Sequence, residues 1–305
     1  MLSISRFKVP AFLLLVFVTV SVWFYNPAGV VADENNSGKG EQIQVDIMSY
    51  NIAHGEGMDD VLDLQRVGDV IKDSGADIIG LQEVDRHWSE RSNLEDQAKW
   101  LAEYLDMHYV YGANLDLDPA EEGNPRRQYG TAVLSKYPIL DSENHLLTQI
   151  IEPGGHNEQR GLLETVINVK GSQLHFFNTH LGLKKEERLL NIEEIKSIIA
   201  KSDKKSVIVG DFNANPWDEE IQQITDVFAD VFAELGMDDT YTYPTRYVDP
   251  ITGEETEPTK RIDYIFSDKD LKVENAGLIE TSASDHMPIM ARFMLDREVP
   301  YDNGN

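Results

Sequence analysis

Short apolar runs rich in β-forming residues recur along most of this chain, and the unusual polar residues stand where such runs end. The first run, residues 42–51 (QIQVDIMSYN), alternates polar and apolar side chains, as a half-buried strand does. Between these runs the apolar residues take helical spacing, for example over residues 62–74, where Gly75 can end a helix. The pattern therefore predicts an α/β fold.

The same patterns predict the other elements. Further helices are expected over residues 94–105, 186–201 and 219–235. Further strands are expected over residues 76–83, 108–112, 130–134, 145–149, 161–169, 173–179, 206–210, 261–266, 271–278 and 287–295. Helices thus intersperse with strands in two similar halves, which favours two packed β-sheets covered outside by helices. At 305 residues the chain suits one large domain or two small ones, but no linker divides it after residue 41, so one domain is predicted over residues 42–296, with a tail over 297–305.

The N-terminal segment has a different character. Arg6 and Lys8 precede an almost uncharged apolar run over residues 9–25, which indicates an export signal. Residues 30–32 (VVA) suit a cleavage ahead of Asp33, although the run is also long enough to remain as a membrane anchor; a buried core helix is the third interpretation. We expect residues 1–32 to be signal or anchor, residues 33–41 a solvated tether, and the protein to be secreted or anchored to the outer face of the cytoplasmic membrane.

Composition excludes some chemistry. The chain has no cysteine, so it has neither a disulfide framework nor a thiolate site. Its formal net charge is −27, and without residues 1–32 it carries 25 Lys and Arg against 54 Asp and Glu, a charge of −29. Such a surface repels polyanions and disfavours a nuclease that tracks nucleic acid, although acidity also keeps an exported protein soluble. A local basic rim could still form from Arg126, Arg127, Arg160, Lys184 and Lys185.

Several polar residues follow strands. Asn51, Glu83 and His180 each have an ordinary explanation alone: a turn cap, a surface carboxylate and an interior histidine. The segment 210–213 (GDFN) is harder to dismiss, because a buried run delivers Asp211 and Asn213 two residues apart, so that both side chains emerge on the same side of the backbone. An Asx turn is the alternative there.

A second cluster is predicted near the C-terminus. Asp285 and His286 are adjacent just before an apolar run, and Asp263 lies inside another, where an ionised carboxylate is costly unless it is paired. His286 is its obvious partner, because a carboxylate that accepts from one imidazole nitrogen fixes the tautomer and stabilises the charged ring.

These motifs resemble those of the endonuclease/exonuclease/phosphatase superfamily, also called the DNase I-like fold. The matching segments occur in the family's order over residues 43–295: SYNI (49–52), LQEVD (81–85), NTHLG (178–182), GDFNANP (210–216), RIDYIF (261–266) and SDHMPI (284–289). The combination of GDFN with SDH is specific, whereas SYN or LQE alone is weak. Within the superfamily the chain is most similar to a bacterial group of exported phosphodiesterases of unsettled substrate, which also resembles a eukaryotic domain linked to glycosylphosphatidylinositol lipid metabolism.

The resemblance implies a four-layer α/β sandwich, with two packed, mainly antiparallel β-sheets flanked by helices. It also implies Mg²⁺ or Mn²⁺ held mainly by Glu83, with help from Asn51 and Asp285, and oxygen ligands do suit hard cations. By the same carry-over, Asp211 would orient or deprotonate the attacking water and Asn213 would position it. The phosphoryl oxygens would be bound by His180 and by the His286–Asp263 pair.

The chain departs from the family at two places. Where relatives carry a carboxylate or tyrosine that supports the first histidine, residues 126–129 here are RRQY, so the partner of His180 is open. Close relatives have a further histidine where Ala53 stands, which leaves His54 as either a substrate contact or a plain loop residue. Arg160 is predicted to pair with a substrate phosphate, or else to form a surface salt bridge.

We therefore predict an exported, divalent-metal-dependent phosphodiesterase acting on a lipid headgroup or other small phosphoester, most simply as a monomer without a protein partner. A secreted nuclease on DNA or RNA is the first alternative. The second is a non-catalytic binding module on the same fold, which usually loses the GDFN aspartate or the SDH histidine; both are present here.

Overall fold

The computed structural model describes residues 42–151 and 157–297. The predictions for residues 1–32 and 33–41, and for most of the tail, fall outside these residues. Within them, no helix is long and apolar enough to cross a membrane.

Two mixed six-stranded sheets form the body of the protein. The first sheet has the order β13-β14-β1-β2-β4-β3, in which β1 and β2 are parallel and the other neighbours are antiparallel. Its strands are β1 (Gln42–Asn51), β2 (Ile78–Arg86), β3 (His108–Leu117), β4 (Arg127–Ser135), β13 (Lys272–Leu278) and β14 (Ile289–Asp296).

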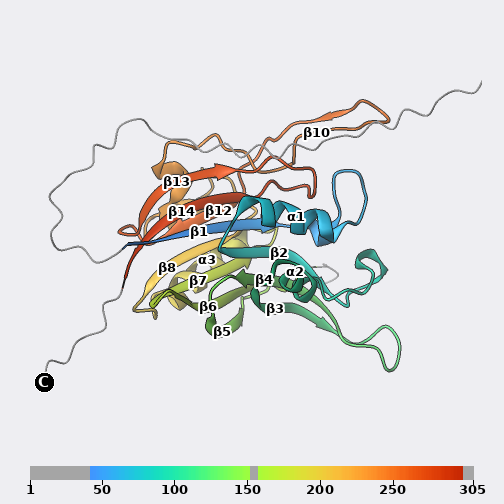
Figure 1. The fold of residues 1–305 in the computed structure, drawn as a ribbon, viewed down its shortest axis with the longest axis horizontal. Helices are drawn as coiled ribbons and strands as arrows, with labels where there is room; N and C mark the ends of the chain where they lie inside the picture. The colour runs from blue at the N-terminus through green and yellow to red at the C-terminus, as the bar shows by residue number, and fades with distance from the viewer. Residues whose placement is uncertain (1–41, 152–156, 298–305) are drawn as a thin grey trace, which may run out of the picture.

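The second sheet repeats this plan with the order β5-β6-β7-β8-β12-β9. Here β7 and β8 are the parallel pair, and the other neighbours are antiparallel. Its strands are β5 (Ile139–Leu146), β6 (Gly161–Val169), β7 (Ser172–His180), β8 (Lys205–Asp211), β9 (Ala229–Asp230) and β12 (Asp263–Ser267). A small hairpin, β10 (Tyr247–Val248) with β11 (Glu255–Thr256), extends from the body (Figure 1).

Three apolar clusters define four layers. The middle cluster joins the inner faces of the sheets, with Ile47 and Val133 from the first sheet and Phe176 and Val209 from the second. The helices α1 (Leu64–Ser74) and α2 (Gln97–Leu105) cover the outer face of the first sheet, and α3 (Lys185–Ile199) and α4 (Glu219–Thr225) cover that of the second. In Figure 1, β1 and β14 lie above β8, β7 and β6. The predicted four-layer sandwich is confirmed.

The single helix predicted over residues 219–235 is wrong. The structure has α4, then β9, then the short α5 (Val231–Glu234). Residues 229 and 230 are extended because they pair with β12, and the Asp230 side chain then accepts from the backbone N–H groups of Phe232 and Ala233. Helical spacing in the sequence did not reveal this tertiary pairing.

Other boundaries shift for local reasons. α1 starts at Leu64 because Asp63 caps it, and Gly75 ends it with φ 75° as predicted. α2 begins at Gln97 rather than 94, because Asn93 and Leu94 take left-handed backbone angles after the 3₁₀ turn η2 (Glu90–Ser92). The strand predicted over 145–149 is β5 at 139–146, an edge strand whose exposed polar residues hide it in the sequence.

Candidate active site

Both parallel strand pairs point the same way, and their carboxyl ends carry the predicted polar residues. Asn51 ends β1, while His180 and Asp211 end β7 and β8 side by side in register. Side chains at the carboxyl ends of parallel strands share one edge of a sheet. The two sheets therefore bring residues 160 positions apart into contact: Nδ2 of Asn51 donates to Oδ2 of Asp211 over 3.1 Å.

Antiparallel neighbours bring the C-terminal motifs to the same place. Asp263 begins β12 directly opposite Asp211. His286 stands just before β14, which pairs with β1, and its Nδ1 lies 2.9 Å from Oδ2 of Asp263. The predicted His286–Asp263 pair is confirmed, and both residues are buried.

Asp211 lies between two imidazoles. Its Oδ2 is 3.6 Å from Nε2 of His286 and 3.6 Å from Nε2 of His180. Burial raises the pKa of Asp211, against the opposing effect of the nearby His286 charge. Burial opposes the charged form of His286 too, but the negative charges of Asp263 and Asp211 outweigh it and raise the pKa of His286 to about 10. The cluster therefore holds a cationic His286 ring beside a carboxylate whose pKa is raised.

Asn213 completes the surroundings of Asp211. Its backbone N–H donates to Oδ1 of Asp211 over 2.9 Å, so the Asx turn considered as the alternative is present. Its side chain nevertheless turns into the cluster, where Nδ2 lies 3.3 Å from Nε2 of His180 and donates to the Leu181 carbonyl over 2.9 Å. The Asx turn is therefore compatible with the contact of the Asn213 side chain with His180.

The partner of His180, left open by the sequence, is Arg160. Its Nη1 lies 3.1 Å from Nδ1 of His180, and its Nη2 lies 2.8 Å from Glu158. A guanidinium can only donate, so Nδ1 of His180 accepts and the ring proton resides on Nε2. Nδ2 of Asn213 is therefore close to Nε2 without donating to it. Burial first, then the charges of Arg160 and His286, hold the pKa of His180 well below its usual value, so the ring is neutral.

Glu83 and Asp285 lie at the rim of this cluster. Glu83 accepts from Nδ2 of Asn51 over 3.1 Å, and Asp285 is near enough to raise the pKa of His286 through its charge. Glu83 has a left-handed backbone (φ 56°) where the β2–β4 ladder is interrupted between Leu81 and Val84. Such a bulge turns one side chain away from the face that strand alternation would give it, and no pattern in the sequence predicted it.

The donor set at this rim fits a hard divalent cation. Among the described residues, Oε2 of Glu83 and Oδ2 of Asp285 make no hydrogen bond, so two carboxylate oxygens are available. Asn51 can add its Oδ1, which accepts from the Ala53 N–H. Asp211, Asp263 and His286 also offer ligand atoms within 4.8 Å of one another, but Asp263 already engages Nδ1 of His286.

His54 remains apart from these contacts. Its Nε2 lies 3.5 Å from Glu56, its carbonyl accepts from Gln97, and its backbone is left-handed (φ 46°). A substrate contact by His54 stays a prediction, as does one by Arg160.

The two sheets approach each other closely beside the site, a feature that no pattern in the sequence indicated. Asn178 lies two residues before His180 on β7 and is fully buried. It donates to the carbonyls of Leu81 and Ala132 in the opposite sheet and accepts from Gln82. A Cβ on Gly80 would lie 2.3 Å from a methyl group of Val209. The glycine permits this close approach, so the polar side chains above it can meet.

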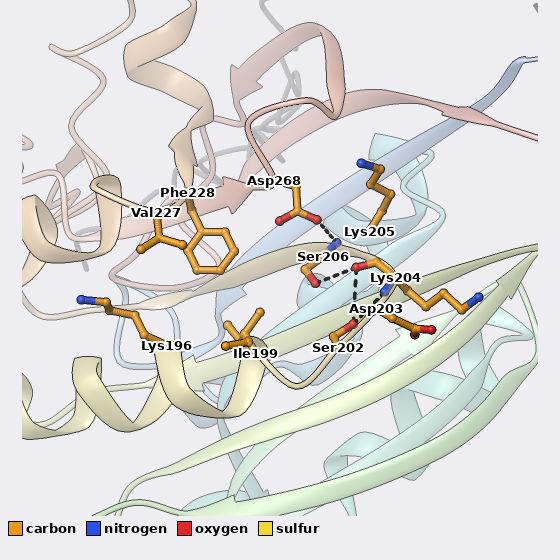
Figure 2. Close-up of a pocket in the computed structure, with 11 residues that line it drawn as sticks. Lys196, Ile199, Ser202, Asp203, Lys204, Lys205, Ser206, Val227, Phe228 and Asp268 are labelled. Carbon is orange, nitrogen blue, oxygen red and sulfur yellow. Dashed lines mark hydrogen bonds between the residues drawn. The ribbon is translucent and has the colours of Figure 1, made fainter.

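A cavity of about 440 Å³ lies at the opposite end of β8, between α3 and the segment after α4 (Figure 2). There Asp268 accepts from the Ser206 backbone N–H, and Lys196 and Phe228 line the wall. It contains none of the predicted site residues.

The site lies at the carboxyl ends of strands from both sheets, and it holds a buried carboxylate between two imidazoles. This arrangement places the protein in the class of hydrolases with a four-layer α/β sandwich fold. The sequence profile of the endonuclease/exonuclease/phosphatase family matches residues 48–286, and the chain belongs to that family.

Three known proteins are similar to this chain in sequence or in fold. The chain is 26% identical over 258 residues to the uncharacterized protein YbhP of Escherichia coli, covering 76% of this chain and 88% of YbhP. An endonuclease/exonuclease/phosphatase structure from Beutenbergia cavernae is similar with a TM-score of 0.65 and 25% identity, covering 83% of this chain and 72% of the other. A mannosyl-6-phosphatase from Bacteroides thetaiotaomicron shares the fold with a TM-score of 0.63 at 18% identity, covering 82% of this chain and all of the other.

Proposed function

We propose that the protein is an exported, divalent-metal-dependent phosphodiesterase that hydrolyses a lipid headgroup or another small phosphoester. The observation that carries the proposal is the placement of Asp211 between His180 and His286, beside the free carboxylate oxygens of Glu83 and Asp285. A water-activating group, two groups suited to phosphoryl oxygens and a cation site thus face one place.

The chain's own residues divide the chemistry. Asp211 accepts a proton from the attacking water, and the raised pKa that burial produces makes it a better base near neutral pH. Asn213, fixed by the Leu181 carbonyl, positions that water. His286 is cationic and stabilises charge that develops on the phosphoryl oxygens, with Asp263 holding its ring. His180 is neutral and donates from Nε2.

A bound Mg²⁺ or Mn²⁺, held by Glu83, Asp285 and Asn51, would polarise a phosphoryl oxygen and stabilise the leaving oxyanion. The all-oxygen donor set supports these ions over softer ones.

The surroundings of the site support a small substrate over a nucleic acid. Arg126, the exposed arginine of the predicted basic rim, contacts both Asp116 and Asp118, and Lys185 contacts Glu219. Arg160 is buried on His180. Three of the five cations of the predicted rim are thus paired to acids or withdrawn from the surface, which weakens the rim as a track for a polyanion backbone. We keep the nuclease as the first alternative.

We also propose that the protein works outside the cytoplasm, secreted or held at the outer face of the membrane, because basic residues precede the apolar run over 9–25. Mass spectrometry of the native protein from cell fractions tests this. We expect a mature N-terminus near Asp33 or a membrane-bound full chain, whereas a soluble cytoplasmic form beginning at Met1 contradicts export.

A panel assay tests the activity. The purified protein is given Mg²⁺ or Mn²⁺ with phosphoinositides, sphingomyelin, simple phosphodiesters, phosphomonoesters, DNA and RNA. We expect the highest kcat/KM on a lipid headgroup or small diester, complete loss with a chelator, and recovery on adding back either ion. The highest kcat/KM on DNA or RNA would replace our proposal with the nuclease, and binding without turnover of any substrate would favour the non-catalytic module.

A further inference from the structure

Four metal-ligating side chains gather on the outer face of the second sheet, away from the active site. Glu143 on β5 lies opposite Glu164 on β6. His145 stands two residues further along β5, and His175 lies on β7. We call them the outer-face cluster: Glu143, His145, Glu164 and His175. His175 precedes His180 by five residues along β7, so the cluster lies roughly 16 Å from the catalytic histidine.

Strand alternation explains why these side chains share a face. In β7, Leu174 and Phe176 point into the core between the sheets, so His175 and Phe177 point outward. In β6, Leu163 faces that same core, which turns Glu164 outward. The register of three adjacent strands therefore assembles the cluster.

The contacts centre on the Glu164 carboxylate. Its Oε2 lies 2.8 Å from Nε2 of His145, and its Oε1 lies 3.4 Å from Nδ1 of His175. Glu143 closes the group, with its Oε1 3.7 Å from Nδ1 of His145. Glu143, His145 and Glu164 can each offer a ligand atom within 4.8 Å of the other two, and His175 adjoins this trio through Glu164.

The cluster is sunken but open on one side. The side chains of His145, Glu164 and His175 are 20%, 23% and 14% exposed, whereas Glu143 is 73% exposed and borders the groove between β5 and α3. An ion could thus enter past Glu143.

Within the outer-face cluster, one buried ring nitrogen has no hydrogen-bond partner among the described residues. Nδ1 of His175 is inaccessible to solvent, and although Glu164 is near, it makes no hydrogen bond among residues 42–151 and 157–297. Buried polar atoms are normally satisfied, and an unsatisfied one in a native structure calls for an explanation such as an ion. Ligation would provide it.

We propose that the outer-face cluster is a second metal site that takes Zn²⁺ or a similar borderline cation. One imidazole and two carboxylates, with the His175 imidazole beside them, form a mixed nitrogen and oxygen donor set, which Zn²⁺ accepts in four-coordinate sites and Mg²⁺ does not favour. Its ligands come from β5, β6 and β7, and β5 is the edge of the sheet. Bound metal therefore fastens the edge strand to the two strands inside it, which makes the site structural and separates it from the proposed phosphoester chemistry.

The test is metal binding, not activity. The purified protein is freed of metal with a chelator and dialysed, and Zn²⁺ alone is titrated by calorimetry while melting is followed in parallel. The double variant His145→Asn/His175→Gln removes both imidazoles, and His108→Gln changes an exposed histidine on β3 as the matched control. Because the catalytic histidines can also bind Zn²⁺, the decisive quantity is the difference in stoichiometry between the variants.

We expect the wild type and His108→Gln to bind one more equivalent of Zn²⁺ than the double variant. Zn²⁺ a hundredfold above its Kd should raise their Tm by roughly 5 °C or more beyond any rise in the double variant. Without metal, the double variant should melt cooperatively. Should it fail to fold, Glu143→Gln, at a mostly exposed position, serves instead and should weaken the Zn²⁺ affinity of this site about tenfold or more. Equal stoichiometry in the wild type and the double variant, or equal affinity in Glu143→Gln, would overturn the proposal.

Discussion

Asp211 is the residue on which the proposed chemistry depends most directly, since among the described residues it alone contacts both histidine rings and both asparagines of the site. Asp211→Asn keeps the shape of the side chain but cannot take a proton. We expect kcat to fall by about 10² or more, the usual scale for a general base. Steady-state kinetics on the best panel substrate measures this, with Asp203→Asn, an exposed aspartate beside the cavity of Figure 2, as the control. Undiminished turnover in folded Asp211→Asn would remove it from the mechanism.

Arg160 offers a choice between two roles that kinetics can separate. If it acts through His180, as the 3.1 Å contact indicates, Arg160→Gln should lower kcat by about tenfold or more and leave KM nearly unchanged. If it binds the substrate phosphate, KM should rise instead. Arg126→Gln is the matched control, because Arg126 is an exposed arginine paired to Asp116. We expect the kcat effect, with Arg160→Lys restoring little because an ammonium lacks the planar guanidinium geometry.

At the scale of elements, Asp230 joins three of them. It pairs as part of β9 with β12, caps α5, and accepts two hydrogen bonds from Arg261 over 3.0 and 2.7 Å. Both side chains are buried, so Asp230→Ala leaves the Arg261 charge unpaired and should lower the free energy of unfolding by about 3–5 kcal/mol. Asp63→Ala removes a comparable cap from α1 without stranding a buried charge, and should cost about 1 kcal/mol. Equal losses in urea unfolding of the two variants would show that the ion pair adds nothing to the cap.

At the scale of the whole molecule, the charge of −27 and the acid-paired arginines and lysines oppose a polyanion track. A protein that makes 6–10 phosphate contacts loses about 10³–10⁵ in affinity between 50 and 200 mM salt. We expect kcat/KM on the best small phosphoester to change less than about threefold over that interval, because few counterions are released. A steep loss would reveal a basic groove that net charge and the described ion pairs do not show, and would favour the nuclease.

Much of this protein follows from local sequence. Most of the order of strands and helices, the layered architecture and the contact between Asp263 and His286 could be predicted, because side-chain alternation, apolar periodicity and the cost of an unpaired buried carboxylate act within a few residues of each position. The GDFN and SDH motifs indicated the family for the same reason, because each lies within a few neighbouring residues.

Tertiary structure decided what depends on partners far along the chain. The helix predicted over 219–235 does not form as one helix, because residues 229 and 230 pair with β12. Arg160 meets His180 because β6 and β7 are neighbours, and Glu83 turns to the site because its ladder with β4 is interrupted. The outer-face cluster exists only through the register of β5, β6 and β7. Spacing along one strand says which face a side chain takes, but only the pairing of strands says what it meets there.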